Sequence, residues 1–259
     1  MPSDGRHDIQ AIQIDSDYGI HMLQLNQEVS PMKKELNYID LIRSRHSTRD
    51  YEQHPLTDAD RAQIMEAVAS AVPLGSTVHL EWKIADRSPM GCSGLVYAEC
   101  GTSDEELAEY GYQGEQIVLA LLADGWGTCW YAMVRMPGSP CSITVGKPAA
   151  RGVRSVVMGT LSRGHMRKLL EQLVTGGIPE DSSPLVRTIL ESARLAPSAM
   201  NHQPWSFEVT SDTQIVIKAH AGRFPDIGIC LANAMVTARQ LAGKATVSRL
   251  DENKYSISW

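Results

Sequence analysis

Apolar residues recur at intervals of three and four in two stretches of the chain, and a proline follows each stretch. This spacing places the apolar side chains on one face of a helix, and proline cannot continue a helix interior. The sequence therefore predicts two amphipathic helices, one ending before Pro73 and one ending before Pro197. Thr57, with Asp60 three residues later, has the capping-box pattern at the start of the first helix, and Ser183 is the expected N-cap of the second.

From Leu36 onward, further helical stretches alternate with short runs typical of strands. Helices are expected from Leu36 to near Arg43, at 115–124 and at 226–243, and strand-like runs lie at 79–85, 95–99, 153–160, 207–210, 214–219, 246–248 and 254–258. Gly125 is expected to close the helix 115–124, and Asp226 to cap the last helix. Helices and strands in separate stretches predict an α+β fold. Residues 1–35 show neither pattern and are interpreted as an N-terminal extension.

Two landmarks repeat along the chain at nearly equal distances. Pro197 follows Pro73 by 124 residues, and Gly243 follows Gly125 by 118 residues. The near agreement suggests a duplicated helix–helix–strand unit, with a first half at 36–165 and a second at 166–259. Chance similarity between two α+β segments is the alternative.

Composition limits the classes of function. The chain has 259 residues, of which 43% are hydrophobic, so it can bury a sizeable core. Its net charge of −6 argues against a nucleic-acid partner or an anionic membrane surface. The longest apolar run, Ile117 to Ala123, is far too short to span a bilayer. No stretch near the start has the pattern of a signal peptide, so a cytoplasmic location is expected.

The cysteines also indicate a cytoplasmic location. The five cysteines are scattered, without a Cys-x-x-Cys pair or metal-ligand spacing. This fits reduced thiols in a cytoplasm better than a disulfide framework, and no metal site is expected.

The stretch from Pro197 to Trp205 has an unusual composition for a connection between a helix and a strand. It holds two prolines together with Ser198, Asn201 and Gln203. Prolines fix the backbone, and small polar residues let backbone amides approach a ligand closely. We interpret this loop as a rigid polar shelf; an ordinary well-made loop is the alternative.

The sequence Pro-Ser-x-x-Asn-x-Gln-Pro-Trp, after Ala193-Arg194-Leu195-Ala196, resembles the flavin loop of the nitroreductase family. A second stretch, Arg45-His46-Ser47-Thr48-Arg49-Asp50-Tyr51, resembles the basic motif near the start of those enzymes. The resemblance extends over most of the chain from Leu36. It implies a nitroreductase-like fold, FMN as cofactor, and a site made where two subunits, or two halves, meet.

The resemblance also assigns roles to the basic motif. Arg45 and Ser47 would bind the FMN phosphate, with His46 as a further donor, and Arg49 would lie near the pyrimidine edge of the flavin. A cation at that edge stabilises the negative charge that reduction creates there. Solvent-exposed charges in and after the last turn of a helix are the alternative for the arginines, as is a water-facing histidine for His46.

Three further segments complete the implied site. The flavin loop would cover one ring face through Pro197, Ser198, Ala199, Met200 and Asn201. Gln203 and Trp205 are expected to hold the loop, and for Trp205 a plain core position is the stronger interpretation. Residues Trp130, Tyr131, Ala132 and Met133 resemble the segment whose backbone amides approach the flavin, although Met133 or Val134 stands where the family usually has glycine. Arg163 and Arg167 are candidates for completing the phosphate site, and a solvated basic cluster is their alternative.

The two halves differ in a complementary way. The first has the basic motif but only Pro73-Leu74-Gly75-Ser76 where a shelf should follow its second helix. The second has the shelf, but its counterpart of the basic motif is near Leu173-Val174-Thr175-Gly176-Gly177, without an arginine. We therefore expect a pseudo-dimeric chain with one FMN site between its halves, either as a monomer or as a loose homodimer.

The implied activity is that of an FMN-dependent oxidoreductase. Hydride from NADH or NADPH would pass through the flavin, in a ping-pong cycle, to a nitroaromatic, a quinone or a similar small acceptor. Two alternatives stay open: a protein that binds or sequesters flavin with little turnover, and a flavin-free interaction module. The missing glycine and the N-terminal extension are the reasons why both alternatives are retained.

Overall fold

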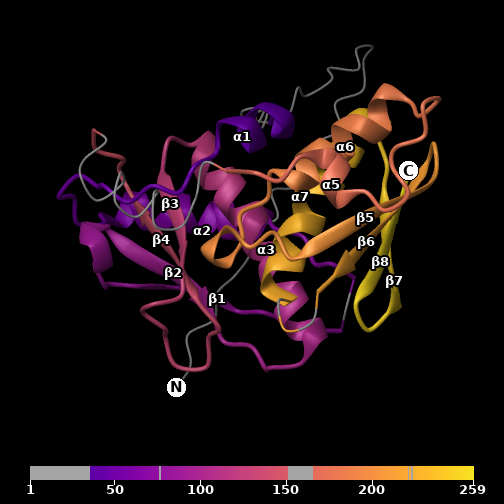
Figure 1. Cartoon of the computed structure of the whole chain (residues 1–259). Helices are drawn as coiled ribbons and strands as arrows, with labels where there is room; N and C mark the ends of the chain where they lie inside the picture. The colour runs from indigo at the N-terminus through magenta and orange to yellow at the C-terminus, as the bar shows by residue number, and fades with distance from the viewer. Residues whose placement is uncertain (1–35, 76, 151–165, 221, 223) are drawn as a thin grey trace, which may run out of the picture. The chain divides into compact units, whose positions relative to one another are not determined.

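Two four-stranded antiparallel sheets, with two long helices between them, dominate the computed structural model of the chain (Figure 1). The structure describes residues 36–75, 77–150, 166–220, 222 and 224–259. The expected N-terminal extension and the strand expected at 153–160 lie outside these residues.

The two sheets have the same internal order. The first has the strand order β1-β2-β4-β3 and the second β5-β6-β8-β7. Their strands are β1 Trp82–Ala85, β2 Gly94–Ala98, β3 Gly127–Tyr131, β4 Ser142–Gly146, β5 Trp205–Ser211, β6 Gln214–Ala219, β7 Thr246–Asp251 and β8 Lys254–Ser258. In each sheet one hairpin precedes a long helix, and a second hairpin follows that helix.

The helices follow a matching order. They are α1 Tyr38–Ser44, α2 Asp58–Ser70, α3 Asp104–Ala123, α5 Leu170–Leu173, α6 Pro184–Arg194 and α7 Phe224–Ala242, with short 3-10 turns at Pro89–Gly91 and Ala199–Asn201. The structure confirms the capping box of Thr57 and Asp60 and the N-cap of Ser183. It also confirms Gly125 after α3, where φ is 79°, a conformation that glycine adopts without strain.

Two expectations were wrong, and one strand was missed. The helix expected at 115–124 starts much earlier, because α3 begins at Asp104, where Ser103 forms a capping box with Glu106. The apolar stripe did not reveal the first turns because α3 buries carboxylates, including Glu109 and Glu115. Asp226 does not cap α7; it lies in the first turn, and its Oδ1 accepts a hydrogen bond from Ala199 N at 3.0 Å. Strand β4 was not expected at all.

Helices α3 and α7 cross at two glycines. A Cβ added at Gly111 would clash with the backbone of Pro225, and one added at Gly228 would clash with the backbone of Ala108. Gly111 and Gly228 are 117 positions apart, and so are Ala108 and Pro225. Such a reciprocal contact is the kind that a two-fold axis generates.

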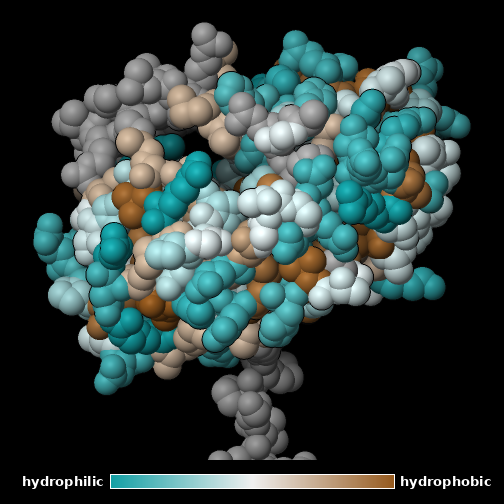
Figure 2. Space-filling model, turned by 90° about the horizontal axis from the view of Figure 1, so that it is seen from below, coloured by the Kyte–Doolittle hydropathy of each residue, from teal (hydrophilic) through white to brown (hydrophobic). Residues whose placement is uncertain are grey.

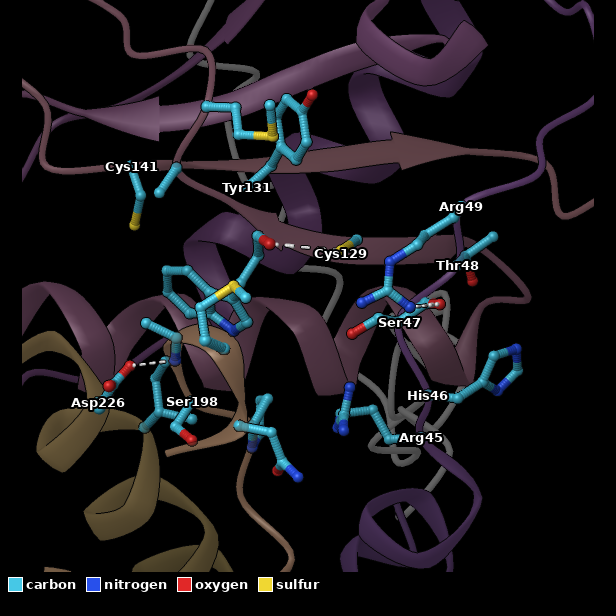
Figure 3. A pocket seen from close by; sticks show the side chains of 18 of the residues that line it. Arg45, His46, Ser47, Thr48, Arg49, Cys129, Tyr131, Cys141, Ser198 and Asp226 are labelled. Atoms are coloured by element: carbon cyan, nitrogen blue, oxygen red, sulfur yellow. Dashed lines mark hydrogen bonds between the residues drawn. The ribbon is translucent and has the colours of Figure 1, made fainter. Parts of the chain in front are cut away.

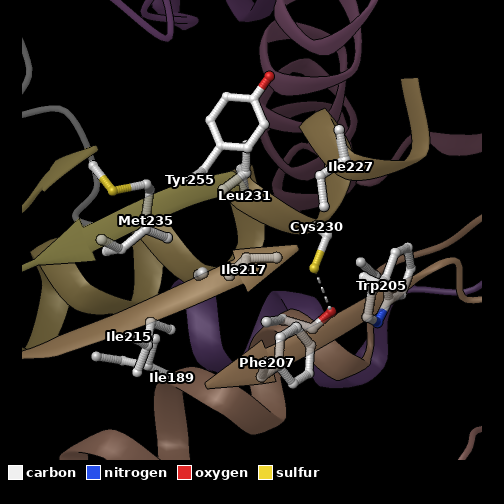
Figure 4. Close-up of a cluster of buried hydrophobic side chains, with 14 of the residues drawn as sticks. Ile189, Trp205, Phe207, Ile215, Ile217, Ile227, Cys230, Leu231, Met235 and Tyr255 are labelled. Atoms are coloured by element: carbon white, nitrogen blue, oxygen red, sulfur yellow. Dashed lines mark hydrogen bonds between the residues drawn. The ribbon is translucent and has the colours of Figure 1, made fainter. Parts of the chain in front are cut away.

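Each sheet packs on its own hydrophobic core. Behind the second sheet, residues of α6 and α7 pack on Trp205, Phe207 and Ile217 (Figure 4). The first sheet packs against α2 and α3 around Ile64, Tyr110 and Ile143. Burial of one such side chain contributes about 2 kcal/mol. The long helices are thus fixed between two packed layers, and the loops at their ends are held with them.

The surface of the described part is mixed in character. Seen from below, hydrophilic side chains cover much of it and apolar ones lie between them (Figure 2). Within residues 36–259, as far as they are described, no helix has the length and apolar character that crossing a membrane requires.

Candidate functional site

A cavity of about 880 Å³ lies between the segment after α1, the end of β3 and the loop after α6 (Figure 3). Its volume is in the range of small-molecule and cofactor sites. Every expected site residue except Arg163 lines it, from Arg45 to Asn201. Arg163 lies outside the described residues, whereas Arg167 is also in the cavity wall.

The basic motif is fixed by backbone contacts to the first sheet. Helix α1 ends at Ser44, and Arg45 N donates to Leu41 O at 2.8 Å. Thr48 N then donates to Thr128 O of β3 at 2.8 Å, and the Tyr51 hydroxyl donates to Thr48 O at 2.8 Å. The motif therefore follows the edge of the sheet, which brings its side chains to the cavity.

Three arginines meet at one end of the cavity. The Arg45 side chain is 7% exposed, and its Nε is 3.8 Å from Glu115 Oε1. The Arg49 Nη1 donates to Ser47 O at 3.4 Å. In Figure 3, Arg45, Ser47 and Arg49 lie together on one side of the view, and Ser198 and Asp226 lie on the other.

The third arginine connects this end to the shelf. Arg167 donates to Asn201 Oδ1, and its Nη2 lies 3.5 Å from Leu195 O. Burial lowers the pKa of Arg167 to about 10, and repulsion from Arg45 and Arg194 adds to the effect. Arg167 is still protonated at neutral pH, so this end of the cavity attracts anions.

The shelf after α6 is held in a strained backbone conformation. Met200, Asn201 and Gln203 have φ values of 50°, 56° and 50°, which L-residues with side chains rarely adopt. Gln203 N donates to Ser198 Oγ at 2.9 Å, and the Gln203 side chain accepts from Lys168 N at 2.8 Å. Trp205 is buried in the core at 1% exposure. Gln203 thus holds the loop, whereas Trp205 is a core residue, and the strain is typical of ligand sites.

The end of β3 forms another wall. Trp130 packs over Gly114 of α3, where a Cβ would clash with the indole ring. The Trp130 Nε1 donates to Glu115 Oε2 at 2.8 Å. Met133, which stands where the family usually has glycine, is 77% exposed at the cavity. Cys129 also lines the cavity, but burial raises the pKa of its thiol, which does not suit a nucleophile.

Comparison with known proteins identifies the family. The family described as "Putative TM nitroreductase" matches residues 37–238, well over half of the chain. The chain belongs to this nitroreductase family. It is accordingly an oxidoreductase that acts on small molecules, with the mixed helix and sheet fold that the sequence predicted.

The solved structure of one relative agrees with the nitroreductase fold. A crystal structure of a "putative nitroreductase" from Thermotoga maritima is 29% identical, covers 89% of this chain and 97% of its own, and gives a TM-score of 0.72. An "FMN-dependent Nitroreductase" from Clostridium difficile R20291 is 16% identical and covers 44% of this chain and 89% of its own, with a TM-score of 0.37. No curated protein matches the chain.

Several residues of the cavity carried no sequence signal. They include Met90, Cys141, Pro148 and Ile229. Met90 reaches the cavity from a turn between β1 and β2, with φ of 59°, and Ile229 reaches it from α7. Both are far in sequence from the recognised motifs, so only the packing of the sheets and helices reveals them. Asp226 was expected as a helix cap and instead anchors the shelf.

The described part of the chain also has a smaller cavity, of about 240 Å³, lined by residues of corresponding segments. Leu74 and Gly75 follow α2 as Ser198 and Ala199 follow α6, and residues 247–249 lie in β7 as 128–130 lie in β3. Across it, Arg249 Nη1 is 3.6 Å from Glu105 Oε2.

Proposed function

We propose that this protein is an FMN-dependent oxidoreductase of the nitroreductase type. NADH or NADPH would supply the reducing equivalents, and a nitroaromatic, a quinone or a similar small molecule would accept them in a ping-pong cycle. The observation that supports this most is the meeting of two distant sequence motifs, Arg45–Arg49 and Pro197–Asn201, in the wall of one large cavity.

The residues of the cavity fit FMN. A flavin mononucleotide has a flat, mostly apolar ring system and an anionic phosphate. The cavity offers three arginines at one end, and the buried Nε of Arg45 has no hydrogen-bond partner among the described residues. Glu115 Oε1, at 3.8 Å from this Nε, balances only one of the three positive charges, so the cluster still favours a bound anion.

The proposed roles follow from charge and position. Arg45, Ser47 and Arg167 bind the phosphate, and His46 adds a donor at the exposed rim. Arg49 lies beside the flavin edge, where a cation stabilises negative charge. Bound FMN would supply the two-electron chemistry, for which the protein itself offers few acids or bases.

The other walls position the flavin and exclude water. Pro197, Ser198, Ala199, Met200 and Asn201 would cover one ring face, held by the anchors of the shelf. Trp130, Tyr131, Ala132 and Met133 would border the ring from the end of β3. The remaining face, beside the exposed Met133, leaves space for the nicotinamide and then for the acceptor.

We also propose that the chain is an internal pseudo-dimer, with halves at 36–165 and 166–259 and a single flavin site. The equal strand orders and the reciprocal glycine contacts support this proposal. The smaller cavity, at about 240 Å³, is too small for a second flavin. A monomer or a loose homodimer in the cytoplasm is then expected; all five cysteines are free thiols, as that compartment favours.

An absorption spectrum of the purified protein tests the proposal. We expect flavin bands that bleach when NADPH or NADH is added without oxygen, and that return on addition of menadione or nitrofurazone. A titration with FMN should saturate at one equivalent per chain. Bound flavin without bleaching would indicate a flavin-sequestering protein, and a protein that stays colourless with added FMN would indicate a flavin-free module; either result contradicts the proposal.

A further inference from the structure

A carboxylate lies buried behind the cationic end of the cavity. Glu115, on α3, has no exposed side-chain surface. Its Oε2 accepts the hydrogen bond from Trp130 Nε1 at 2.8 Å, and its Oε1 is 3.8 Å from Arg45 Nε. Among the described residues, neither Oε1 nor Nε has a hydrogen-bond partner. Glu115 therefore contacts two side chains of the cavity wall without lining the cavity itself.

The surroundings of Glu115 make both of its protonation states accessible. Burial raises its pKa to about 7, against the attraction of Arg45, the hydrogen bond from Trp130 and the attraction of Arg167. These three groups face the carboxylate from the segment after α1, from β3 and from the segment before α5. Near neutral pH, Glu115 is therefore close to the midpoint of its titration.

A phosphate beside Arg45 would change this balance. Phosphate monoesters carry close to two negative charges at neutral pH, and charges interact strongly where water is excluded. Arg45 cannot neutralise a phosphate and Glu115 together, so a bound phosphate disfavours the ionised form of Glu115. Protonation leaves the Trp130 hydrogen bond intact, because one oxygen of a carboxylic acid is still a good acceptor.

We propose that Glu115 is a positioning residue: its buried carboxylate holds Arg45 and Trp130 at the cavity wall, and it takes up a proton when a phosphate-bearing flavin binds. This inference rests on the proposed function, because it requires FMN in this cavity. It makes flavin affinity dependent on pH through a residue that does not touch the flavin.

The direction in which pH changes flavin affinity follows from the coupling between proton uptake and flavin binding. In the free protein Glu115 titrates near pH 7, and a bound phosphate moves its titration to a higher pH. Between the two values, binding takes up a proton, and flavin affinity falls as pH rises. Well below pH 7 the residue is protonated in both states and contributes no pH dependence. The second phosphate ionisation, near pH 6, has the opposite sign and is largely over by pH 7, so the fall is measured from pH 7 upward.

Isothermal titration calorimetry of the full chain tests the proposal. FMN and riboflavin would be titrated at pH 7, 8 and 9, each in two buffers with different ionisation enthalpies, which gives the number of protons taken up. For FMN we expect proton uptake and a dissociation constant that rises about tenfold for each unit by which phosphate raises the pKa of Glu115. Riboflavin, which lacks the phosphate, should show neither effect.

Two variants separate proton linkage from structural damage. Glu115→Gln keeps an acceptor for Trp130, so it should bind FMN without proton uptake and more tightly than the wild type at pH 9. Glu109→Gln is the matched control. Glu109 is an equally buried carboxylate on α3, but it accepts from Leu74 N and Gln113. This variant should keep the proton uptake of the wild type.

Three outcomes would overturn the inference. The first is FMN binding to the wild type without proton uptake, which leaves the proposed function intact and is decisive even if a variant does not fold. The second is undiminished proton uptake in Glu115→Gln. The third is FMN binding by Glu115→Ala as tight as by Glu115→Gln at pH 7, which would remove the positioning role. Absence of FMN binding to the wild type would overturn the proposed function as well.

Discussion

The two cavities are built from corresponding segments, but they differ in volume and in the arrangement of their charged side chains. In both, the loop after a helix is anchored by a backbone amide to a buried carboxylate of a long helix: Leu74 N bonds Glu109 at 2.9 Å, and Ala199 N bonds Asp226 at 3.0 Å. The anchor positions, like the crossing glycines, are 117 residues apart. The backbone around the two cavities is therefore arranged in a similar way.

The charges at the two cavities are arranged differently. In the small cavity, Arg249 pairs with Glu105 and also donates to the Asp251 and Glu252 carbonyls. In the large cavity, Arg45 also has a carboxylate nearby, since its Nε is 3.8 Å from Glu115 Oε1, but this Nε makes no hydrogen bond among the described residues, and Arg45 and Arg167 repel each other. The small cavity has one arginine with one carboxylate, whereas three arginines beside the carboxylate of Glu115 leave this end of the large cavity with an excess of positive charge that attracts an anion. A few side chains thus decide which of two similar frames can hold a cofactor.

The largest expected effect distinguishes the two cavities directly. Arg45→Ala removes a buried cation from the proposed phosphate site and should weaken FMN binding roughly 100-fold, or about 3 kcal/mol. Arg249→Ala, the matched change in the small cavity, should leave FMN affinity within about twofold, because a partly exposed ion pair contributes little. Fluorescence titration of the apoprotein with FMN measures both. Equal losses in the two variants would contradict the assignment of the site.

A smaller effect is expected on stability, at the helix crossing that the halves share. Gly111→Ala and Gly228→Ala each place a Cβ against the backbone of the opposite helix, which cannot move as a side chain can. Each should lower the free energy of unfolding by about 2 kcal/mol, since overpacking outweighs the gain in helix propensity. Urea denaturation measures this.

The matched control for the helix crossing is Gly125→Ala, after α3. A Cβ at that position meets no atom within 4 Å but has to adopt φ of 79°, so any loss reports backbone strain alone. A clear difference between the Gly111 and Gly228 variants, with one of them as stable as the wild type, would show that the crossing is not reciprocal.

Patterns of neighbouring residues predicted those features of the structure that contacts between neighbouring residues determine. Thr57 with Asp60 and Ser183 with Pro184 fix helix starts through contacts only a few residues away. The two motifs were recognisable because each is continuous in sequence, and the cavity contains both.

The rest depends on packing between distant segments. The start of α3 was missed because Glu109 and Glu115 interrupt its apolar pattern, although the fold buries both. Their partners, Leu74 and Arg45, lie far away in sequence. Met90 and Ile229 reach the cavity only because the hairpin β1–β2 and helix α7 converge there. No local pattern encodes such convergence.

The smallest expected effect concerns the strain that the large cavity carries. Met200 has φ of 50° and is 64% exposed, so its side chain contributes little packing to offset the backbone cost. Met200→Gly should therefore raise the free energy of unfolding by about 1 kcal/mol. Met200→Leu, which keeps a Cβ, should not stabilise the protein.

The same substitution should also weaken FMN binding slightly, because a flexible glycine loosens a shelf that the rigid backbone otherwise holds ready for the ring. Urea denaturation of the apoprotein and FMN titration, performed on the same samples, measure the two effects together. If Met200→Gly lowered stability, the side chain would be contributing more than the strain costs. The shelf would then owe its shape to packing by Met200, and not to the surrounding hydrogen bonds of Ser198, Gln203 and Asp226.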